Sequence, residues 1–220
     1  MVFLHGYLSS KEAFTAQIEY FSRFYRVTAF DFIGFGGSGG LVAPFSVFDY
    51  AGWTKEVLSL LRVKKPHIIA HSFGCRVAVK MASQDENAFD RIILTGPAGI
   101  ITRRGFAYHA KVQSYRFVKR FAPKYAERKF GSAEYRTLSP IMKESYKKIV
   151  NEDLRTDAEK IINPTLIVEG EEDKTTPMSE AKIYLKALQK GELQTMQGGH
   201  FAFAEHPFIF NLIAEEFLYD

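Results

Sequence analysis

The sequence predicts an α/β protein in which a mostly parallel sheet of about six strands is covered by helices on both faces. Three observations lead to this prediction. Short runs of apolar and β-branched residues alternate along the chain with segments of helical spacing. These runs are apolar enough for strands buried on both faces. The unusual polar and glycine-rich motifs come directly after the runs, where the carboxyl ends of parallel strands gather.

The first half of the chain supplies four of the expected strands and the helices between them. The run VFLH leads straight into Gly6, and RVTAFD ends in an aspartate before a glycine-rich stretch. HIIAH is apolar throughout its centre, and RIILTG ends in a glycine. These four runs predict strands at residues 2–5, 26–31, 67–71 and 91–96, with helices at 11–24, 48–64 and 74–84.

The second half begins with a segment that breaks the alternation and ends by resuming it. Residues 101–158 are helical, aromatic and basic, with thirteen Lys or Arg against three Glu between residues 101 and 150. We expect them to form a helical cap inserted in a core made of residues 1–100 and 159–220. The resumed core predicts strands at 164–170 and 192–197, and helices at 178–190 and 206–218, with Pro207 suited to a first helical turn.

Composition narrows the class of protein. Hydrophobic residues make up 46% of the 220, which suffices for a core, but no apolar run approaches the roughly 18–20 residues that cross a bilayer. The net charge of +4 comes without a helix–turn–helix, RNP-like or zinc pattern, so a local basic surface is expected and no nucleic acid partner. The single cysteine, Cys75, excludes a disulfide within the chain, and nothing suggests a metal or organic cofactor. With no signal-peptide pattern at residue 1, we expect a cytoplasmic protein; the oligomeric state is not indicated.

A serine turn lies between a predicted strand and a predicted helix. AHSFG, residues 70–74, is a small-x-Ser-x-Gly variant of the G-x-S-x-G turn that presents a nucleophilic serine. Ala70 replaces the first glycine and adds only a methyl group. An ordinary hydroxyl in a strand–helix connection is the alternative interpretation. The predicted strand before Ser72 and helix after it favour a nucleophile on a strained turn.

A serine nucleophile needs a base, and a histidine base needs a carboxylate to orient it. His200 follows the last predicted strand after two glycines, so its loop can carry the imidazole over the sheet edge. The loop VEGEEDKTTP, after the preceding strand, offers Asp173 and, as second candidate, Glu172. We expect Ser72, Asp173 and His200 to be the catalytic residues.

Further residues are candidates for contacts with the substrate. The tetrahedral intermediate of acyl transfer needs two N–H donors, and we expect them from the backbone of Phe73 and Tyr7. Other candidates for substrate binding are His5, Arg76, Phe106, Tyr108 and Tyr115. For Arg76, one helical turn after the serine, a structural pairing with a carboxylate is the favoured interpretation.

Five motifs, HGYLSS, DFIGFGGS, AHSFG, GEEDKTTP and GGH, occur in a fixed order. This order resembles the α/β-hydrolase fold family, in its serine-nucleophile branch with a helical cap after the sixth strand of the family's sheet. The resemblance covers nearly the whole chain outside the cap. It implies Ser72 as nucleophile, His200 as base and Asp173 as its partner. It also implies that Asp31 and the glycines after it shape a loop beside the site.

One departure from the family pattern concerns the start of the sheet. Members of the family usually carry an antiparallel strand pair before the HG strand, but here that strand begins at residue 2. We therefore expect a fold without this pair, through either a shortened N-terminus or a lost sheet edge, and with one exposed edge strand.

The predicted function is that of a carboxylesterase-like serine hydrolase acting on a small acyl substrate, an ester or thioester, through an acyl-enzyme. One alternative on the same fold is a C–C bond hydrolase or lyase acting on an anionic substrate, which the basic cap would suit. A second is a non-catalytic ligand receptor, since a fold alone does not establish activity. A third is a lipase or acyltransferase whose basic aromatic cap touches a membrane surface. The sequence does not name the substrate.

Overall fold

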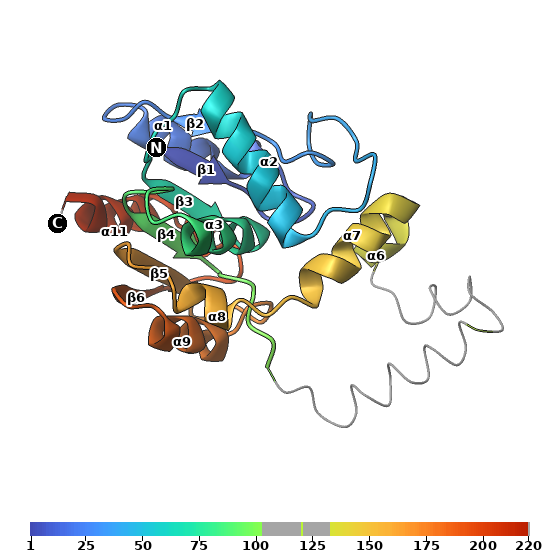
Figure 1. Ribbon diagram of the computed structural model, residues 1–220. Coiled ribbons are helices and arrows are strands. Elements are labelled where there is room, and N and C mark those ends of the chain that lie inside the picture. The colour runs from blue at the N-terminus through green and yellow to red at the C-terminus, as the bar shows by residue number, and fades with distance from the viewer. Residues whose placement is uncertain (103–119, 121–132, 220) are drawn as a thin grey trace.

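The computed structural model describes residues 1–102, 120 and 133–219. Its centre is a six-stranded sheet of strand order β2-β1-β3-β4-β5-β6, in which every neighbouring pair is parallel (Figure 1). The prediction of a mostly parallel sheet of about six strands is confirmed. The strands are β1 (Val2–Leu4), β2 (Thr28–Ala29), β3 (Ile68–His71), β4 (Ile92–Thr95), β5 (Thr165–Gly170) and β6 (Gly191–Met196).

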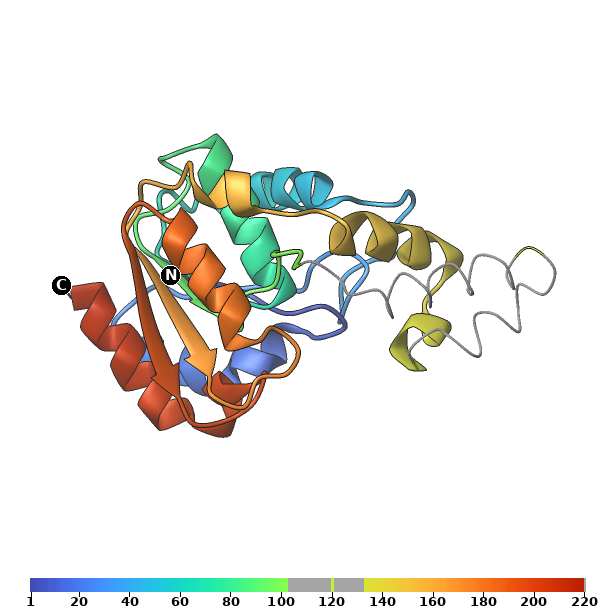
Figure 2. The same ribbon diagram turned by 90° about the horizontal axis from the view of Figure 1, so that it is seen from below.

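Helices cover both faces of the sheet because successive strand residues point to opposite sides. On one face, residues such as Leu4 and Leu94 pack with the buried side chains of α2, α3, α8 and α9. On the other face, Phe3 and Ile93 pack with those of α1, α10 and α11. Figure 2 shows the sheet edge-on between these two layers. The helices are α1 (Thr15–Phe21), α2 (Val47–Leu60), α3 (Phe73–Gln84), α8 (Arg155–Ala158), α9 (Met178–Ala187), α10 (Ala202–Glu205) and α11 (Pro207–Tyr219).

Two elements near the N-terminus are shorter than predicted. The helix expected at 11–24 is a 3₁₀ turn, η1 (Lys11–Phe14), followed by α1. The strand expected at 26–31 keeps only Thr28 and Ala29. The reason lies in Asp31, whose carboxylate accepts hydrogen bonds from the amides of Lys11 and Gly37 at 2.8 Å each. These bonds fold residues 31–37 into turns, so the chain leaves the sheet edge early.

The described part of the inserted segment between β4 and β5 is helical. It comprises α6 (Ala133–Thr137), α7 (Pro140–Val150) and α8. Helices α6 and α7 lie beyond the carboxyl ends of the strands, whereas α8 packs beside α3 and α9 (Figure 1). Ser139 caps α7 by accepting a hydrogen bond from the amide of Met142, and Pro140 occupies the first turn. In the described ranges, no helix combines the length and apolar character that a membrane span requires.

Candidate active site

Ser72 occupies a strained turn between β3 and α3. Its φ of 49° and ψ of −107° lie outside the regions that a serine adopts without strain. The turn is tight because α3 packs directly on β1: a side chain at Gly74 would collide with the carbonyl group of Leu4. Ala70 is fully buried in β3, so the sheet accepts its extra methyl group. The strand–turn–helix context expected for the serine is present.

The structure brings Ser72, His200 and Asp173 together from three separate loops. His200 lies in the loop after β6, with its Nε2 2.9 Å from the Oγ of Ser72. Its Nδ1 lies 2.6 Å from the Oδ2 of Asp173, which follows β5. The imidazole therefore bridges hydroxyl and carboxylate, in the arrangement that lets a histidine take a proton from a serine. Glu172, the second candidate for the carboxylate, is exposed, and it is the carboxylate of Asp173 that contacts the imidazole.

Asp173 is buried, but its carboxylate accepts four hydrogen bonds. Its Oδ1 accepts from the amides of Thr175 and Thr176 at 2.7 and 3.0 Å. Its Oδ2 accepts from the Thr176 hydroxyl at 2.9 Å and from His200. Burial opposes the charge on Asp173, but these donors outweigh it and lower the pKa of the carboxyl to about 2. This stabilisation is complete above the unfolded pKa near 4 and is lost as the pH falls toward 2.

Thr176 is a residue of the site that sequence reasoning missed. Besides its two bonds to Asp173, its hydroxyl lies 3.2 Å from the Nδ1 of His200. The side chain is buried. The signal was present in the motif GEEDKTTP, three residues after the aspartate. A threonine in a loop has many possible partners, and only the folded arrangement of the loops after β5 and β6 brings its hydroxyl to Asp173 and His200.

Two buried histidines hold the loops of the site. His71 donates from Nε2 to the carbonyl of His200 at 2.9 Å, and its ring packs against Phe201 and Phe203. Burial, with a smaller contribution from the charge of His200, lowers the pKa of His71 to about 3, so its ring is neutral. It therefore fixes the backbone of the base without carrying a charge.

The prediction of His5 as a substrate contact is wrong. The side chain is fully buried, and both ring nitrogens bind backbone: Nδ1 donates to Gly6 at 2.7 Å, and Nε2 accepts from the amide of Phe32 at 3.0 Å. His5 thereby ties the loop after β1 to the loop after β2. Asp31, which also holds the second loop, has the structural position that the resemblance implied.

The loop after β1 forms a turn beside Ser72. The amide of Ser9 donates to the carbonyl of Gly6 at 3.3 Å, and Leu8 has a φ of 55°. In such a turn the N–H of the second residue, here Tyr7, is not part of the closing bond. The N–H of Phe73 is also free of an intrahelical partner, because Phe73 is the first residue of α3. Both residues line the pocket that contains Ser72.

The pocket over Ser72 has a volume of about 680 Å³, the size of a small-molecule site. Residues from both the first and the second half of the chain form its walls. Aromatic and aliphatic residues that sequence reasoning did not single out make up much of the lining: Ile100, Ile101, Tyr146, Ile149, Val150 and Phe201. The predicted contacts Phe106, Tyr108 and Tyr115 lie outside the described residues.

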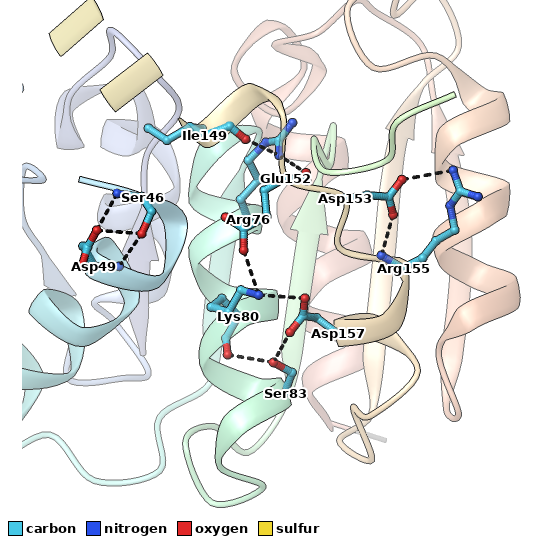
Figure 3. A network of polar contacts seen from close by, with 10 residues as sticks. All are labelled: Ser46, Asp49, Arg76, Lys80, Ser83, Ile149, Glu152, Asp153, Arg155 and Asp157. Atoms are coloured by element: carbon cyan, nitrogen blue, oxygen red, sulfur yellow. Dashed lines mark hydrogen bonds and ion pairs between the residues drawn. The ribbon is translucent and has the colours of Figure 1, made fainter. Parts of the chain in front are cut away.

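Arg76 also lines this pocket, but its guanidinium is engaged by backbone. One of its terminal nitrogens, Nη1, donates to the carbonyls of Ile149 and Glu152 at 2.9 Å each, at the end of α7 (Figure 3). The side chain is only 8% exposed. The pairing is structural, as the favoured interpretation expected, although the partners are carbonyl groups and not a side-chain carboxylate.

A second cation on α3 extends this attachment. Lys80 forms ion pairs with Glu152 at 2.9 Å and Asp157 at 2.8 Å, and Ser83 donates to the other oxygen of Asp157 (Figure 3). Helix α3 therefore carries Ser72 at its start and, on its next two turns, holds the chain that runs from α7 into α8. In the described part of the chain, no group of three or more His, Cys, Asp and Glu is placed to hold a metal ion.

The fold and the ordered motifs define a class of protein. The model of the alpha/beta hydrolase fold family matches residues 1–139, and the chain belongs to this family. Among solved structures, an esterase from Exiguobacterium antarcticum superimposes with a TM-score of 0.79 at 21% identity, covering 100% of this chain and 91% of the esterase. An enol-lactonase from Burkholderia xenovorans gives 0.77 at 18% identity and covers 100% of this chain and 90% of that one. At these identities the likeness concerns the fold.

Two curated relatives are more similar in sequence. The chain is 28% identical over 113 residues to (E)-2-((N-methylformamido)methylene)succinate hydrolase from Acinetobacter baylyi, a match to 51% of this chain but only 42% of that enzyme. It is 27% identical over 245 aligned positions to the AB hydrolase superfamily protein YisY from Bacillus subtilis, covering 99% of this chain and 90% of YisY. Relatives and fold together support a hydrolase.

Proposed function

We propose that this protein is a serine hydrolase that cleaves a carboxylic ester or thioester through an acyl-enzyme. The observation that carries the proposal is the continuous line of contacts from the Ser72 hydroxyl through His200 to Asp173. Ser72 and His200 line a pocket large enough for a small acyl substrate. The strained backbone of Ser72 supports the same assignment, because strain of this kind gathers at functional residues.

In the first step, His200 takes the proton of Ser72 while the serine oxygen attacks the acyl carbonyl. The carbonyl oxygen becomes negative and is held by the amides of Phe73 and Tyr7, each worth about 3–4 kcal/mol in the transition state. Asp173, charged because of its four donors, stabilises the imidazolium and holds its tautomer. His200 then gives the proton to the leaving group.

In the second step, water attacks the acyl-enzyme with His200 again acting as base. The serine oxygen leaves with a proton returned by the imidazole, and the acid product departs. The exposed side of His200 faces the pocket, so water reaches the reacting carbon once the leaving group has gone.

The pocket favours a neutral acyl substrate over an anionic one. The guanidinium of Arg76 already donates to two carbonyls, and Glu180 brings an acidic side chain to the same wall. The rest of the described lining combines aromatic and aliphatic side chains with uncharged hydroxyl groups and the two histidines of the site. These features support an ester of a neutral acid, and they weigh against the C–C bond hydrolase or lyase with an anionic substrate. We infer that residues 101–158 act as the cap that completes this pocket.

The test is a pair of serine substitutions assayed with p-nitrophenyl acetate and a fluorophosphonate probe. Ser72→Ala removes the nucleophile, so both turnover and labelling are expected to disappear while the circular dichroism spectrum is unchanged. Ser59→Ala, an exposed serine of α2, is the matched control and is expected to behave as wild type. Undiminished turnover in Ser72→Ala contradicts the assignment. Failure of the folded wild-type protein to label or turn over any ester favours a ligand receptor.

A further inference from the structure

Glu169 is a buried acid that the proposed chemistry does not use. It is the fifth residue of β5 and is fully inaccessible to solvent. Among the described residues, no donor reaches either of its carboxyl oxygens. An ionised carboxylate without donors is very unfavourable in a protein interior, whereas a protonated one needs only a partner for its O–H. Burial, with the nearby charge of Asp173, raises the pKa of Glu169 to about 8.

Asp173 follows Glu169 by four residues, across the turn that its amide closes on the carbonyl of Gly170, and lies close enough for its charge to raise the pKa of Glu169, but it has the opposite environment. Its oxygens accept four hydrogen bonds, from Thr175, Thr176 and His200. Two carboxyl groups this close do not ionise independently, because the first charge opposes the second. The donors decide which of the two is charged. They all belong to Asp173, so the negative charge stays there and the proton stays on Glu169.

We propose that Glu169 and Asp173 form a carboxyl pair that carries a single negative charge at neutral pH, with the proton held by Glu169. Glu169 is then a positioning residue: it acts on His200 only through Asp173, and it does not line the pocket. The effect of Glu169 on His200 during catalysis rests on the proposed function. The location of the proton on Glu169 does not depend on it.

The other groups around Glu169 also favour its neutral form. From α9, the acidic Glu180 opposes a second charge on Glu169. From α3, the Cys75 thiol lies near enough to be influenced by Glu169, and burial raises the pKa of that thiol so that it stays neutral. On the flanking strands, Thr195 of β6 lies opposite Glu169, and Thr95 of β4 lies opposite the preceding residue. These neighbouring groups are acidic or uncharged, so none of them favours a charge on Glu169.

The pair makes stability depend on pH in a defined direction. The pKa of Glu169 is higher in the folded than in the unfolded chain, so the folded state binds the extra proton between the two values. Stability is therefore lost as the pH rises from about 4.5 toward about 8, and the loss is constant above that. A glutamine at this position keeps the shape and a donor but never ionises, so it removes this loss.

The first experiment compares the melting temperatures of wild type, Glu169→Gln and Glu172→Gln from about pH 5 to about pH 9. Glu172 is an exposed glutamate in the loop after the same strand and serves as the matched control. Glu169→Gln is expected to melt near wild type at about pH 5 and at a clearly higher temperature above pH 8, whereas Glu172→Gln follows wild type throughout. Parallel curves for Glu169→Gln and wild type overturn the proposal.

Two spectroscopic titrations test the pair without any turnover, and the first of them needs only the wild-type protein. The infrared carbonyl band of a protonated carboxyl is expected at neutral pH and should disappear with a midpoint near pH 8. The NMR signal of the proton between His200 and Asp173 is expected to shift with the same midpoint, and to stop doing so in Glu169→Gln. Absence of the band at neutral pH overturns the proposal even if Ser72→Ala abolishes turnover. Its presence supports the proposal even in a protein that hydrolyses no ester.

Discussion

Gly74 and Gly52 allow one substitution to be tested in two surroundings. A Cβ at Gly74, in the first turn of α3, would overlap the carbonyl oxygen of Leu4 and lie 2.7 Å from its carbon and 2.9 Å from the carbonyl oxygen of His5. All three are backbone atoms of β1 and its end, which cannot swing away as a side chain can. A Cβ at Gly52, in the middle of α2, meets nothing within 4 Å.

The expected free energies follow from these contacts. Overpacking a well-packed site costs about 1–3 kcal/mol, and more where backbone must move, so we expect Gly74→Ala to lose about 3 kcal/mol or more. Alanine is favoured over glycine within a helix by about 0.8–1 kcal/mol, so Gly52→Ala should gain close to that amount. The two variants should therefore differ by about 4 kcal/mol, a large part of the 5–15 kcal/mol by which domains are usually stable.

Urea unfolding followed by far-ultraviolet circular dichroism measures both variants. The Ser72 turn is the second readout, since Gly74→Ala should also weaken fluorophosphonate labelling in whatever fraction remains folded. If Gly74→Ala unfolds within about 1 kcal/mol of wild type, the close packing of α3 on β1 is not what fixes this glycine, and the reasoning is refuted.

Two further predictions concern side chains that support the site without taking part in the reaction: Thr176, which contacts Asp173 and His200, and Arg76, which binds the end of α7. Thr176→Val removes the hydroxyl that contacts Asp173 and His200, so kcat for the ester should fall about tenfold with KM unchanged. Thr176→Ser keeps a hydroxyl and should restore kcat. A valine variant with full kcat would exclude this role. Arg76→Met leaves the carbonyls at the end of α7 without their charged donor, at about 1.5–3 kcal/mol for each bond, so hydrogen exchange in α7 should accelerate more than in β3. Unchanged exchange in α7 would show that the attachment is not needed.

Much of the arrangement was predictable because strong local signals coincide with topology. Apolar runs placed the strands, and parallel strands bring their carboxyl ends to one edge, so Ser72, Asp173 and His200 could be assigned to one site before any coordinates. The order of the motifs then narrowed the family. For these features, local pattern and global fold point in the same direction.

What escaped prediction depends on contacts between residues far apart in the sequence. His5 lies two residues before Tyr7 in the sequence, yet its ring does not face the substrate pocket, because its Nε2 accepts a hydrogen bond from the amide of Phe32. The strand containing Thr28 is short because of amides at Lys11 and Gly37. From the sequence alone, Glu169 would be expected to be ionised and solvent-exposed like most glutamates. Nothing in the neighbouring residues indicates that its strand buries it without a hydrogen-bond donor. No periodicity encodes such partners.

The hold of α3 on the chain after α7 has a consequence for engineering selectivity. Grafting the segment between β4 and β5 from one family member onto another is an obvious way to exchange substrate ranges. Here a grafted segment would not bind Arg76 and Lys80 unless it brought matching carbonyls and acids. Helix α3, which follows the reactive Ser72, would then lose the contacts that stabilise its position. A chimera should therefore exchange the outward face of α3 together with the segment, so that donor and acceptor arrive as a set.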